Sequence, residues 1–328
     1  MFRKSLLCAA SLLFAGCEPV AEENEFKDGL PSKEMVEVKA PGGNGQKLET
    51  DSARMFAQSD TSDFYKLTRG ATVVVNGGTA AVLNLIEEIT EHTPTSIQGD
   101  TAVWGPHTDA LSPNTWKLSV TQDSEHKYSF KLEGKAKTAE DSAFKVILSG
   151  THTIATDAQG NRVRNFGAGL LKIDWDAAQT LPEHGDEVGT AEIRYERPNA
   201  TAEAKVEADF RNVKDNERPG TRVNVDYRYK ETPGAGGEFD FALDKNLDTD
   251  STRPAIEHVT VKSRWIQTGA GRADAKVTRG DLGTNEGTIS ECWDANFASQ
   301  YFTISFPAYS YGNVSACGSF STAVYSVL

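Results

Sequence analysis

The sequence of 328 residues has no excess of positive charge. Its 34 Lys and Arg residues stand against 47 Asp and Glu residues, a formal net charge of −13. Proteins that bind nucleic acid or anionic lipid heads need a basic face, so this balance argues against both classes. Long apolar runs are missing too, and none reaches the roughly 18–20 residues of a membrane-spanning helix. The remaining composition, 38% hydrophobic and 25% charged, is typical of a folded soluble protein.

The common catalytic patterns are also missing. The sequence contains no GxSxG nucleophile elbow, no GxxxxGK[ST] phosphate loop and no HExxH metal motif. The six histidines are scattered, and the pair His107 and Asp109 has no further ligand to complete a metal site. The sequence therefore predicts no enzymatic activity, no catalytic residue, no cofactor and no metal.

Two acidic patterns resemble functional sites only in part. Asp174 and Asp176 would share one face of a strand, at a spacing that a glycosidase carboxylate pair allows. The stretch Asp244–Asp250 is similar to the start of a calcium loop. However, Thr249 stands where the turn glycine belongs and Ala255 where the bidentate Glu belongs. We interpret both patterns as solvated surface segments.

The N-terminus is organised as an export signal. Arg3 and Lys4 precede the apolar segment Ser5–Ala15, which is too short to span a membrane. The next residues, ending Leu-Phe-Ala-Gly-Cys17, resemble the lipobox of bacterial lipoproteins, with Phe14 where Leu is usual. An ordinary secretory signal is the alternative, but it prefers a small residue where Phe14 stands.

The lipobox resemblance implies that residues 1–16 are a signal peptide and that Cys17 is lipidated after cleavage. Several acyl chains on one residue give stable anchoring, so the membrane is an expected partner. Glu18 follows the cysteine, whereas Asp is the usual signal for retention in the inner membrane. We therefore expect a lipid-anchored protein of the cell envelope, in the outer membrane rather than the inner one.

Cysteine usage agrees with export. Cys8 leaves with the signal and Cys17 takes the lipid, so Cys292 and Cys317 remain. An even pair in an exported bacterial protein predicts a disulfide. Two free thiols or a metal pair are the alternatives, but the pair has neither CxxC spacing nor a neighbouring histidine to support a metal.

The segment 17–60 predicts a lipidated N-terminus followed by an acidic, flexible tether. It is rich in Glu, Pro, Gly and Ser and has no sustained apolar periodicity, so it has little apolar surface to bury. Residues 61–328 have no second core and no internal repeat. They predict a single β-rich domain.

One helix is expected in this domain, near residues 79–92. Its apolar residues recur with the helical period, Asn76 or Thr79 is available as an N-cap, and Pro94 follows the end. The apolar residues are Val82, Leu85, Ile86 and Ile89.

Nearly all of the chain after this helix alternates between apolar and polar residues. Trp116, Leu118 and Val120 are one example, and short turn sequences separate about 11–12 such segments. No helical crossovers lie between them, so the strands are expected to form an antiparallel meander. A long sheet tends to curl. The predicted fold class is therefore mainly β (α+β), a curved antiparallel meander sheet or half-barrel with the helix on its concave face.

Aromatic residues recur on the apolar face of these strands. They would line a cavity for an acyl chain or another apolar ligand, or they would pack as ordinary core, and the sequence leaves both interpretations open. The candidate ligand-binding residues are Trp104, Trp116, Tyr128, Phe130 and Tyr227.

Several stretches resemble a group of uncharacterised proteobacterial exported lipoproteins. The resemblance covers most of residues 61–328 and implies no particular activity. It rests on Phe64–Arg69, Val75–Gly77, Val103–Pro106, Gly167–Gly169 with Asp174, and Glu291–Asp294 with Cys317.

A looser similarity, at the level of the fold, is to LolA/LolB-like lipoprotein carriers, in which a curved antiparallel sheet holds helices over a cavity for acyl chains. The predicted function is that of a non-enzymatic envelope lipoprotein with a structural or interaction role and an unknown protein partner. The alternative is a carrier or binder of acyl chains or another apolar ligand in the concave face.

Overall fold

The computed structural model describes residues 25–42, 60–215, 220–247 and 252–328. The predicted signal peptide and Cys17 lie outside the described residues, as do residues 18–24 and 43–59 of the predicted tether.

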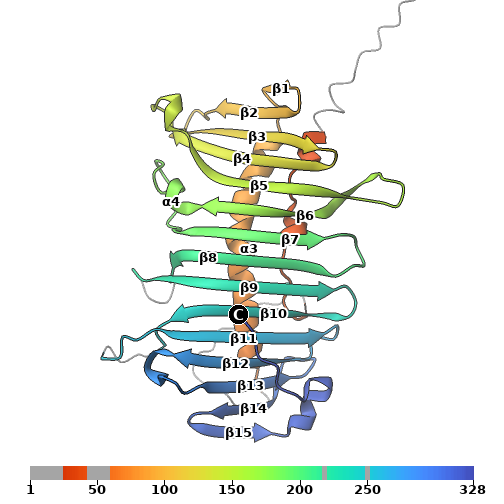
Figure 1. Cartoon of the computed structure of the whole chain (residues 1–328), viewed down its shortest axis with the longest axis vertical. Helices are drawn as coiled ribbons and strands as arrows, with labels where there is room; N and C mark the ends of the chain where they lie inside the picture. Colours follow the sequence, from red (N-terminus) through yellow and green to blue (C-terminus); the bar gives the residue numbers. More distant parts are fainter. Residues whose placement is uncertain (1–24, 43–59, 216–219, 248–251) are drawn as a thin grey trace, which may run out of the picture.

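The fifteen strands of the described residues form one antiparallel sheet, in which each strand pairs with its neighbours along the chain (Figure 1). The sheet does not close into a barrel, and the predicted mainly β meander is confirmed. The strands are β1 Ser96–Gln98, β2 Thr101–His107, β3 Asn114–Ser124, β4 Lys127–Ala136, β5 Lys145–Thr156, β6 Arg162–Asp174, β7 Thr190–Arg197, β8 Ala204–Lys214, β9 Arg222–Thr232, β10 Gly236–Lys245, β11 Glu257–Ile266, β12 Gly271–Arg279, β13 Gly287–Trp293, β14 Ser299–Ser305 and β15 Ala308–Gly312.

The sequence predicts about 11–12 strands rather than the fifteen described, and the reasons lie in the local sequence of the missing strands. The edge strands β1 and β15 have only three and five residues, too few to show a period. Strand β2 contains Gly105 and a cis Pro106, and β6 carries Gly167 and Gly169, so neither alternates cleanly. Short edges also limit pairing with other chains.

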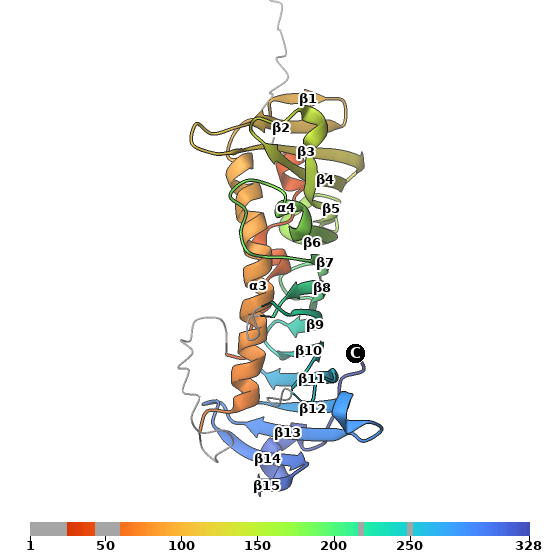
Figure 2. The ribbon, with the colours of Figure 1, turned by 90° about the vertical axis from the view of Figure 1, so that its left-hand side faces the viewer.

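The helix α3, Asp63–Thr90, runs across the strands along one face of the sheet, the inner face (Figure 2). At 1.5 Å per residue its 28 residues are about 42 Å long, which matches the width of about nine strands. The remaining short helices are α2 Lys33–Val36, α4 Trp175–Ala178, η1 Asp141–Ala143, η2 Gly280–Leu282 and η3 Val314–Phe320.

The predicted start of α3, near residue 79, is wrong. The helix begins at Asp63, where the Ser62 hydroxyl caps it by accepting from the backbone N–H of Tyr65. It then continues through Gly77, so neither Asn76 nor Thr79 is its N-cap. The buried side of the helix includes Phe64, Thr68, Thr72, Val75, Thr79, Leu83 and Ile86, which recur every three or four residues.

The prediction of a flexible tether is wrong for residues 25–42. This segment, which we call the arm, lies along the inner face, and Phe26, Met35 and Val38 are buried in the core. Asn76 of α3 holds the arm by a reciprocal pair of bonds: its Oδ1 accepts from Val38 N at 2.9 Å and its Nδ2 donates to Val38 O at 2.8 Å. The described part of the folded domain therefore includes residues 25–42 and does not begin at 61.

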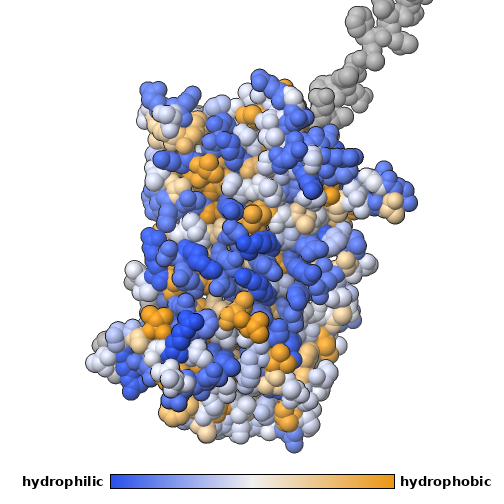
Figure 3. Space-filling view, viewed as in Figure 1, coloured by the Kyte–Doolittle hydropathy of each residue, from blue (hydrophilic) through white to orange (hydrophobic). Residues whose placement is uncertain are grey.

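The face of the sheet opposite α3, the outer face, is largely hydrophilic (Figure 3). Cross-strand ion pairs cover it, because charged residues occupy every second position of neighbouring strands. Examples are Arg211–Asp226 at 2.6 Å and Arg228–Asp209 at 2.7 Å. Single exposed pairs of this kind contribute little to stability. Their effect is to keep one face of a large open sheet solvated.

Candidate functional site

The five aromatic residues proposed to bind a ligand belong to the hydrophobic core or pack against it. Tyr128, Trp104, Phe130 and Tyr227 are at most 7% exposed, and Trp116 packs partly buried against the same core. Their neighbours are other side chains, as in the stacking of Tyr227 on Phe239 with ring centroids 5.5 Å apart. Their environment therefore supports core packing rather than a ligand site.

The acidic patterns have structural roles. Asp174 ends β6 and caps α4 by accepting from the backbone N–H of Ala177 at 2.8 Å, so the pair does not share one face of a strand. Asp176 accepts from Gly189 N at 2.8 Å, which lowers the pKa of its carboxyl, and it forms an ion pair with Arg222.

The other candidate ligands do not gather into a metal site. Asp244 lies within 2.8 Å of His258 Nδ1, and residues 248–251 of the calcium-like stretch lie outside the described residues. The imidazole Nε2 of His107 is 2.9 Å from Oδ1 of Asp109. In the described ranges, no group of three or more His, Cys, Asp or Glu side chains is placed to hold a metal ion.

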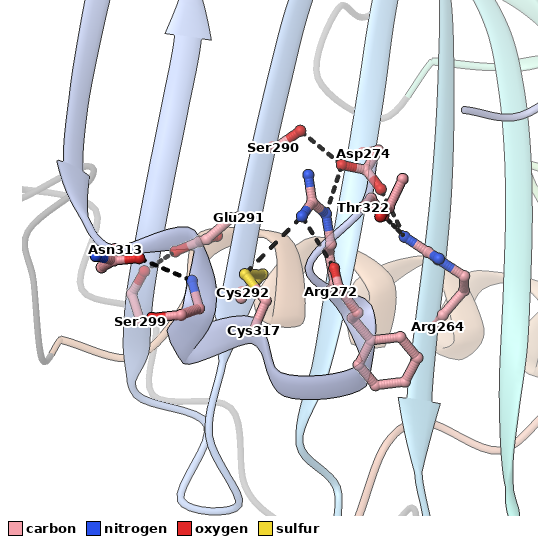
Figure 4. Close-up of a disulfide and its surroundings, with 12 residues drawn as sticks. Arg264, Arg272, Asp274, Ser290, Glu291, Cys292, Ser299, Asn313, Cys317 and Thr322 are labelled. Carbon is pink, nitrogen blue, oxygen red and sulfur yellow. Dashed lines mark hydrogen bonds and ion pairs between the residues drawn. A yellow bond between two sulfur atoms is a disulfide. The ribbon is translucent and has the colours of Figure 1, made fainter. Parts of the chain in front are cut away.

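The disulfide between Cys292 and Cys317 is confirmed, with the two Cα atoms 5.4 Å apart (Figure 4). It fixes the C-terminal segment, residues 313–328, which we call the strap, on the outer face. Beneath the strap lies Asp274, with no exposed surface. Its carboxylate accepts from Arg272 Nε, Arg264 Nη2, Ser290 Oγ and the backbone N–H of Val324, at 2.6–2.9 Å.

The Asp274 cluster is a structural feature rather than a reactive one. A buried carboxylate is stable only when its lone pairs are satisfied, and here four donors satisfy them. The two arginines also hold the strap directly, since Arg272 donates to Phe320 O and Arg264 to Thr322 O. The network closes the strap over the sheet.

A second buried carboxylate, Glu291, fixes the start of α3 from the inner face. Its Oε2 accepts from the backbone N–H of Phe64 at 2.8 Å, and its Oε1 accepts from Ser299 Oγ at 2.5 Å. A negative charge at a helix N-terminus is favourable, but burial still raises the pKa of Glu291 above its usual range.

A site with free space and a buried unsatisfied polar group lies between the arm, α3 and the β5–β6 hairpin. It is a partly open cavity of about 250 Å³. Its apolar walls include Leu30 and Met35 of the arm, Leu83 and Ile86 of α3, and Ile154 of β5. Much of the remaining lining is polar or charged, with Lys27, Asp28, Glu34, Thr90 and Asn165 among it.

Ion pairs stand around the mouth of this cavity. Arg162 contacts Glu25, Arg164 contacts Asp28 at 3.6 Å, and Lys33 of the arm contacts Glu87 of α3. The Tyr128 hydroxyl also donates to Glu25, so the arm is held at its first described residue by both the sheet and the hairpin.

His152 lies on the wall of the cavity and is 1% exposed. Its Nδ1 is 2.8 Å from the Tyr195 hydroxyl, whereas its Nε2 is buried without a hydrogen-bond partner among the described residues. Burial lowers the pKa of His152 to about 4, against the smaller opposite effect of a hydrogen bond with the Ala168 backbone. The imidazole is therefore neutral at pH 7.

Sequence reasoning missed this cavity. His152 alternates with polar residues in its strand like any surface histidine, and the arm that forms one wall has the composition of a linker. The only available signal was the group of glycines in β6, Gly167 and Gly169, which leave room for the imidazole and for Tyr195.

Comparison with known proteins identifies no relative: no family model, no curated protein and no solved structure matches the chain. The resemblances to exported lipoproteins and to lipoprotein carriers therefore stay predictions. Among the helices of the described residues, none is both long and apolar enough to cross a membrane.

Proposed function

We propose that this protein is a lipid-anchored lipoprotein of the bacterial cell envelope with a non-enzymatic structural or interaction role. The observation that carries the proposal is the sequence Leu13–Cys17 after a short export signal. The disulfide supports it, because disulfides persist in oxidising compartments such as the periplasm.

The arrangement of the domain supports a scaffold role. The apolar inner face is covered by α3 and the arm, while the outer face and the segment beneath the strap carry ion pairs. An open sheet covered on one face in this way offers a large polar surface to a protein partner. We place the protein in the outer membrane, because Glu18 rather than Asp follows the lipidated cysteine.

The carrier alternative has less support. An acyl chain on the concave face would have to displace Tyr128, Phe130 and the other core residues, which are buried against α3 and the arm. Displacing well-packed core side chains is costly. This alternative therefore requires α3 or the arm to move away from the sheet.

Metabolic labelling tests the anchor. Cells that express the full chain are given labelled palmitate, and the label should enter the wild-type protein but not Cys17→Ser. Cys8→Ser is the matched control and should keep the label, since Cys8 lies within the signal. Label in Cys17→Ser, or none in the wild type, would contradict the proposal.

A further inference from the structure

The sheet has an open edge at β15, at the end of the molecule opposite β1 (Figure 1). Strand β15 pairs with β14 on one side, and no strand of the described residues pairs with its other side. The free N–H and C=O groups of an edge strand can pair with another chain, and proteins usually block this with Lys, Pro or a bulge within the strand. The strand Ala308–Gly312 contains none of these, and all its residues except the half-buried Tyr311 are exposed.

The part of the sequence that contains β15 has no charged side chain. Residues 295–328 include no Asp, Glu, Lys, Arg or His, although charged residues make up 25% of the whole sequence. Figure 3 shows pale rather than strongly hydrophilic residues over this end of the molecule. Two copies of the chain, each with a formal net charge of −13, repel each other over most of their surfaces. At this end they can meet without bringing like charges together.

The sequence of β15 is nearly symmetric about its central residue. Ser310 is flanked by Tyr309 and Tyr311, and the small residues Ala308 and Gly312 stand at the two ends. If two copies of β15 pair antiparallel with their Ser310 residues opposite each other, each Tyr309 faces the second copy's Tyr311. A two-fold symmetric contact is self-complementary in this way. The symmetry therefore favours a second copy of this chain, rather than an unrelated extended peptide, at the open edge.

The side-chain contacts of such a pair come from Tyr309 and Tyr311. Both rings pack near Phe302 of β14, with centroids 6.2 Å and 5.6 Å from it, yet Tyr309 is 54% exposed. The Tyr311 hydroxyl is 2.7 Å from Ser299 Oγ, which also bonds Glu291 on the inner face. Opposed side chains of an antiparallel pair point to the same face, so the four tyrosines of two copies would form one aromatic cluster there.

We propose that two copies of this chain associate through the open edge of β15, so that their sheets continue into each other across a two-fold axis at Ser310. The contact consists of backbone hydrogen bonds between the two strands and of the four tyrosines. Five residues from each copy make a small interface, and interfaces below about 1,200 Å² are typical of transient complexes, so the dimer dissociates readily. This proposal does not depend on lipidation of Cys17.

Sedimentation equilibrium of residues 18–328, which contain every described residue and lack Cys17, tests the association. The weight-average mass should rise from that of a monomer toward that of a dimer as the protein concentration increases from micromolar to millimolar. Ser310→Lys places two ammonium groups opposite each other at the axis and should weaken dimerisation about tenfold. The matched control is Gln159→Lys, which changes the net charge equally at an exposed turn between β5 and β6 and should leave dimerisation unchanged.

A cysteine at the same position locates the axis. Directly opposed residues of an antiparallel pair have Cβ atoms about 4.5–5.5 Å apart, which a small adjustment brings into the range of a disulfide. Mild oxidation should therefore link two copies of Ser310→Cys into a dimer that reductant separates. Gln159→Cys should stay monomeric under the same conditions. Because the new disulfide traps the pair, this measurement also detects a dimer that is only a small fraction at equilibrium.

The proposal is wrong if the wild-type mass stays that of a monomer at every concentration. It is also wrong if Ser310→Lys and Gln159→Lys dimerise equally, because the contact would then lie on another surface. Oxidation that links Ser310→Cys no faster than Gln159→Cys would exclude an axis at Ser310.

Discussion

Gly169 shows how one residue makes the His152 site. His152, Gly169 and Tyr195 lie in register on β5, β6 and β7. Because Gly169 has no side chain, the Tyr195 hydroxyl reaches over β6 to Nδ1 of His152. A Cβ on Gly169 would lie 2.3 Å from that hydroxyl and 2.3 Å from Thr151 O.

Gly169→Ala is therefore expected to be destabilising. The added methyl group must displace either the Tyr195 hydroxyl or the backbone of β5, and overpacking of this kind costs about 1–3 kcal/mol. Urea unfolding measures the loss. Gly185→Ala is the control, because a Cβ there meets nothing within 4 Å, and its effect should be close to zero. Equal effects of the two substitutions would contradict the packing described.

His152 should also make stability depend on pH. Burial lowers its pKa from 6.5 to about 4 in the folded protein, so between these values the unfolded chain binds a proton that the folded protein does not. Stability is therefore unaffected by this group above pH 6.5 and falls as the pH decreases from 6.5 to 4. This loss of unfolding free energy is about 3 kcal/mol, because each unit of pKa shift corresponds to about 1.4 kcal/mol.

The measurement compares His152→Gln with the wild type. The loss of unfolding free energy between pH 7 and pH 4.5 should be smaller in His152→Gln, whereas His184→Gln, on an exposed side chain, should follow the wild type. Carboxylates titrate equally in all three proteins, so the difference reports on His152. Parallel pH profiles would show that the imidazole is not held neutral.

At the scale of elements, α3 forms against its own local preferences. Residues 70–77 of this helix contain the β-branched run Thr72–Val75 as well as Gly70 and Gly77, all poor helix formers. The buried threonines satisfy their hydroxyls within the helix, as Thr68 donates to Phe64 O and Thr79 to Val75 O. Packing against the sheet therefore decides where the helix begins.

Gly77→Ala is expected to stabilise the protein. A Cβ at this position meets nothing within 4 Å, and alanine in a helix interior is favoured over glycine by about 0.5–1 kcal/mol. Gly70→Ala meets the same conditions and should give the same gain. Chemical denaturation measures both. Destabilisation by both substitutions would indicate that this part of the chain is not helical.

The strap is the element that the disulfide controls. Cys292 and Cys317 are 25 residues apart, and closing such a loop contributes on the order of 3 kcal/mol in the chain-entropy model. The double variant Cys292→Ser/Cys317→Ser should lose about this much. Amide exchange of Val324, whose N–H is bonded to Asp274, should become faster.

The reduced wild type is the control for the strap. Reductant should make it resemble the double variant, and it should not affect the double variant itself. Unchanged amide exchange of Val324 in the reduced wild type and in the double variant would show that the buried Asp274 network holds the strap without the disulfide.

At the scale of the whole molecule, the arm and α3 together cover the apolar face of one open sheet. The arm contributes Phe26, Leu30, Met35, Val36 and Val38 to the core. Without these side chains the sheet would expose apolar residues near Tyr128 and Tyr229, whose hydroxyls also lose Glu25 and the Lys39 N–H. The arm is thus part of the fold rather than a spacer.

Truncation tests this boundary. A chain of residues 43–328 should be much less stable than residues 18–328, should bind a dye that detects exposed apolar surface and should lose cooperative unfolding. Truncation to residue 25 removes no described contact and is the control. Equal stability of all three chains would restore the interpretation of residues 25–42 as a tether.

The fold class, the antiparallel meander and the disulfide can be predicted from the sequence alone, because period-two alternation, short turns and a lone cysteine pair are local or compositional signals. The sequence also carries the segment Leu13–Cys17, whose resemblance to a lipobox is the basis of the proposed anchoring. The tertiary structure alone decided the start of α3, the place of the arm, the core role of the aromatics and the His152 cavity. These depend on residues far apart in the chain that meet only when the sheet and helix pack. A Thr- and Gly-rich segment becomes a helix, and an acidic segment becomes core, because the sheet has an apolar face that must be covered.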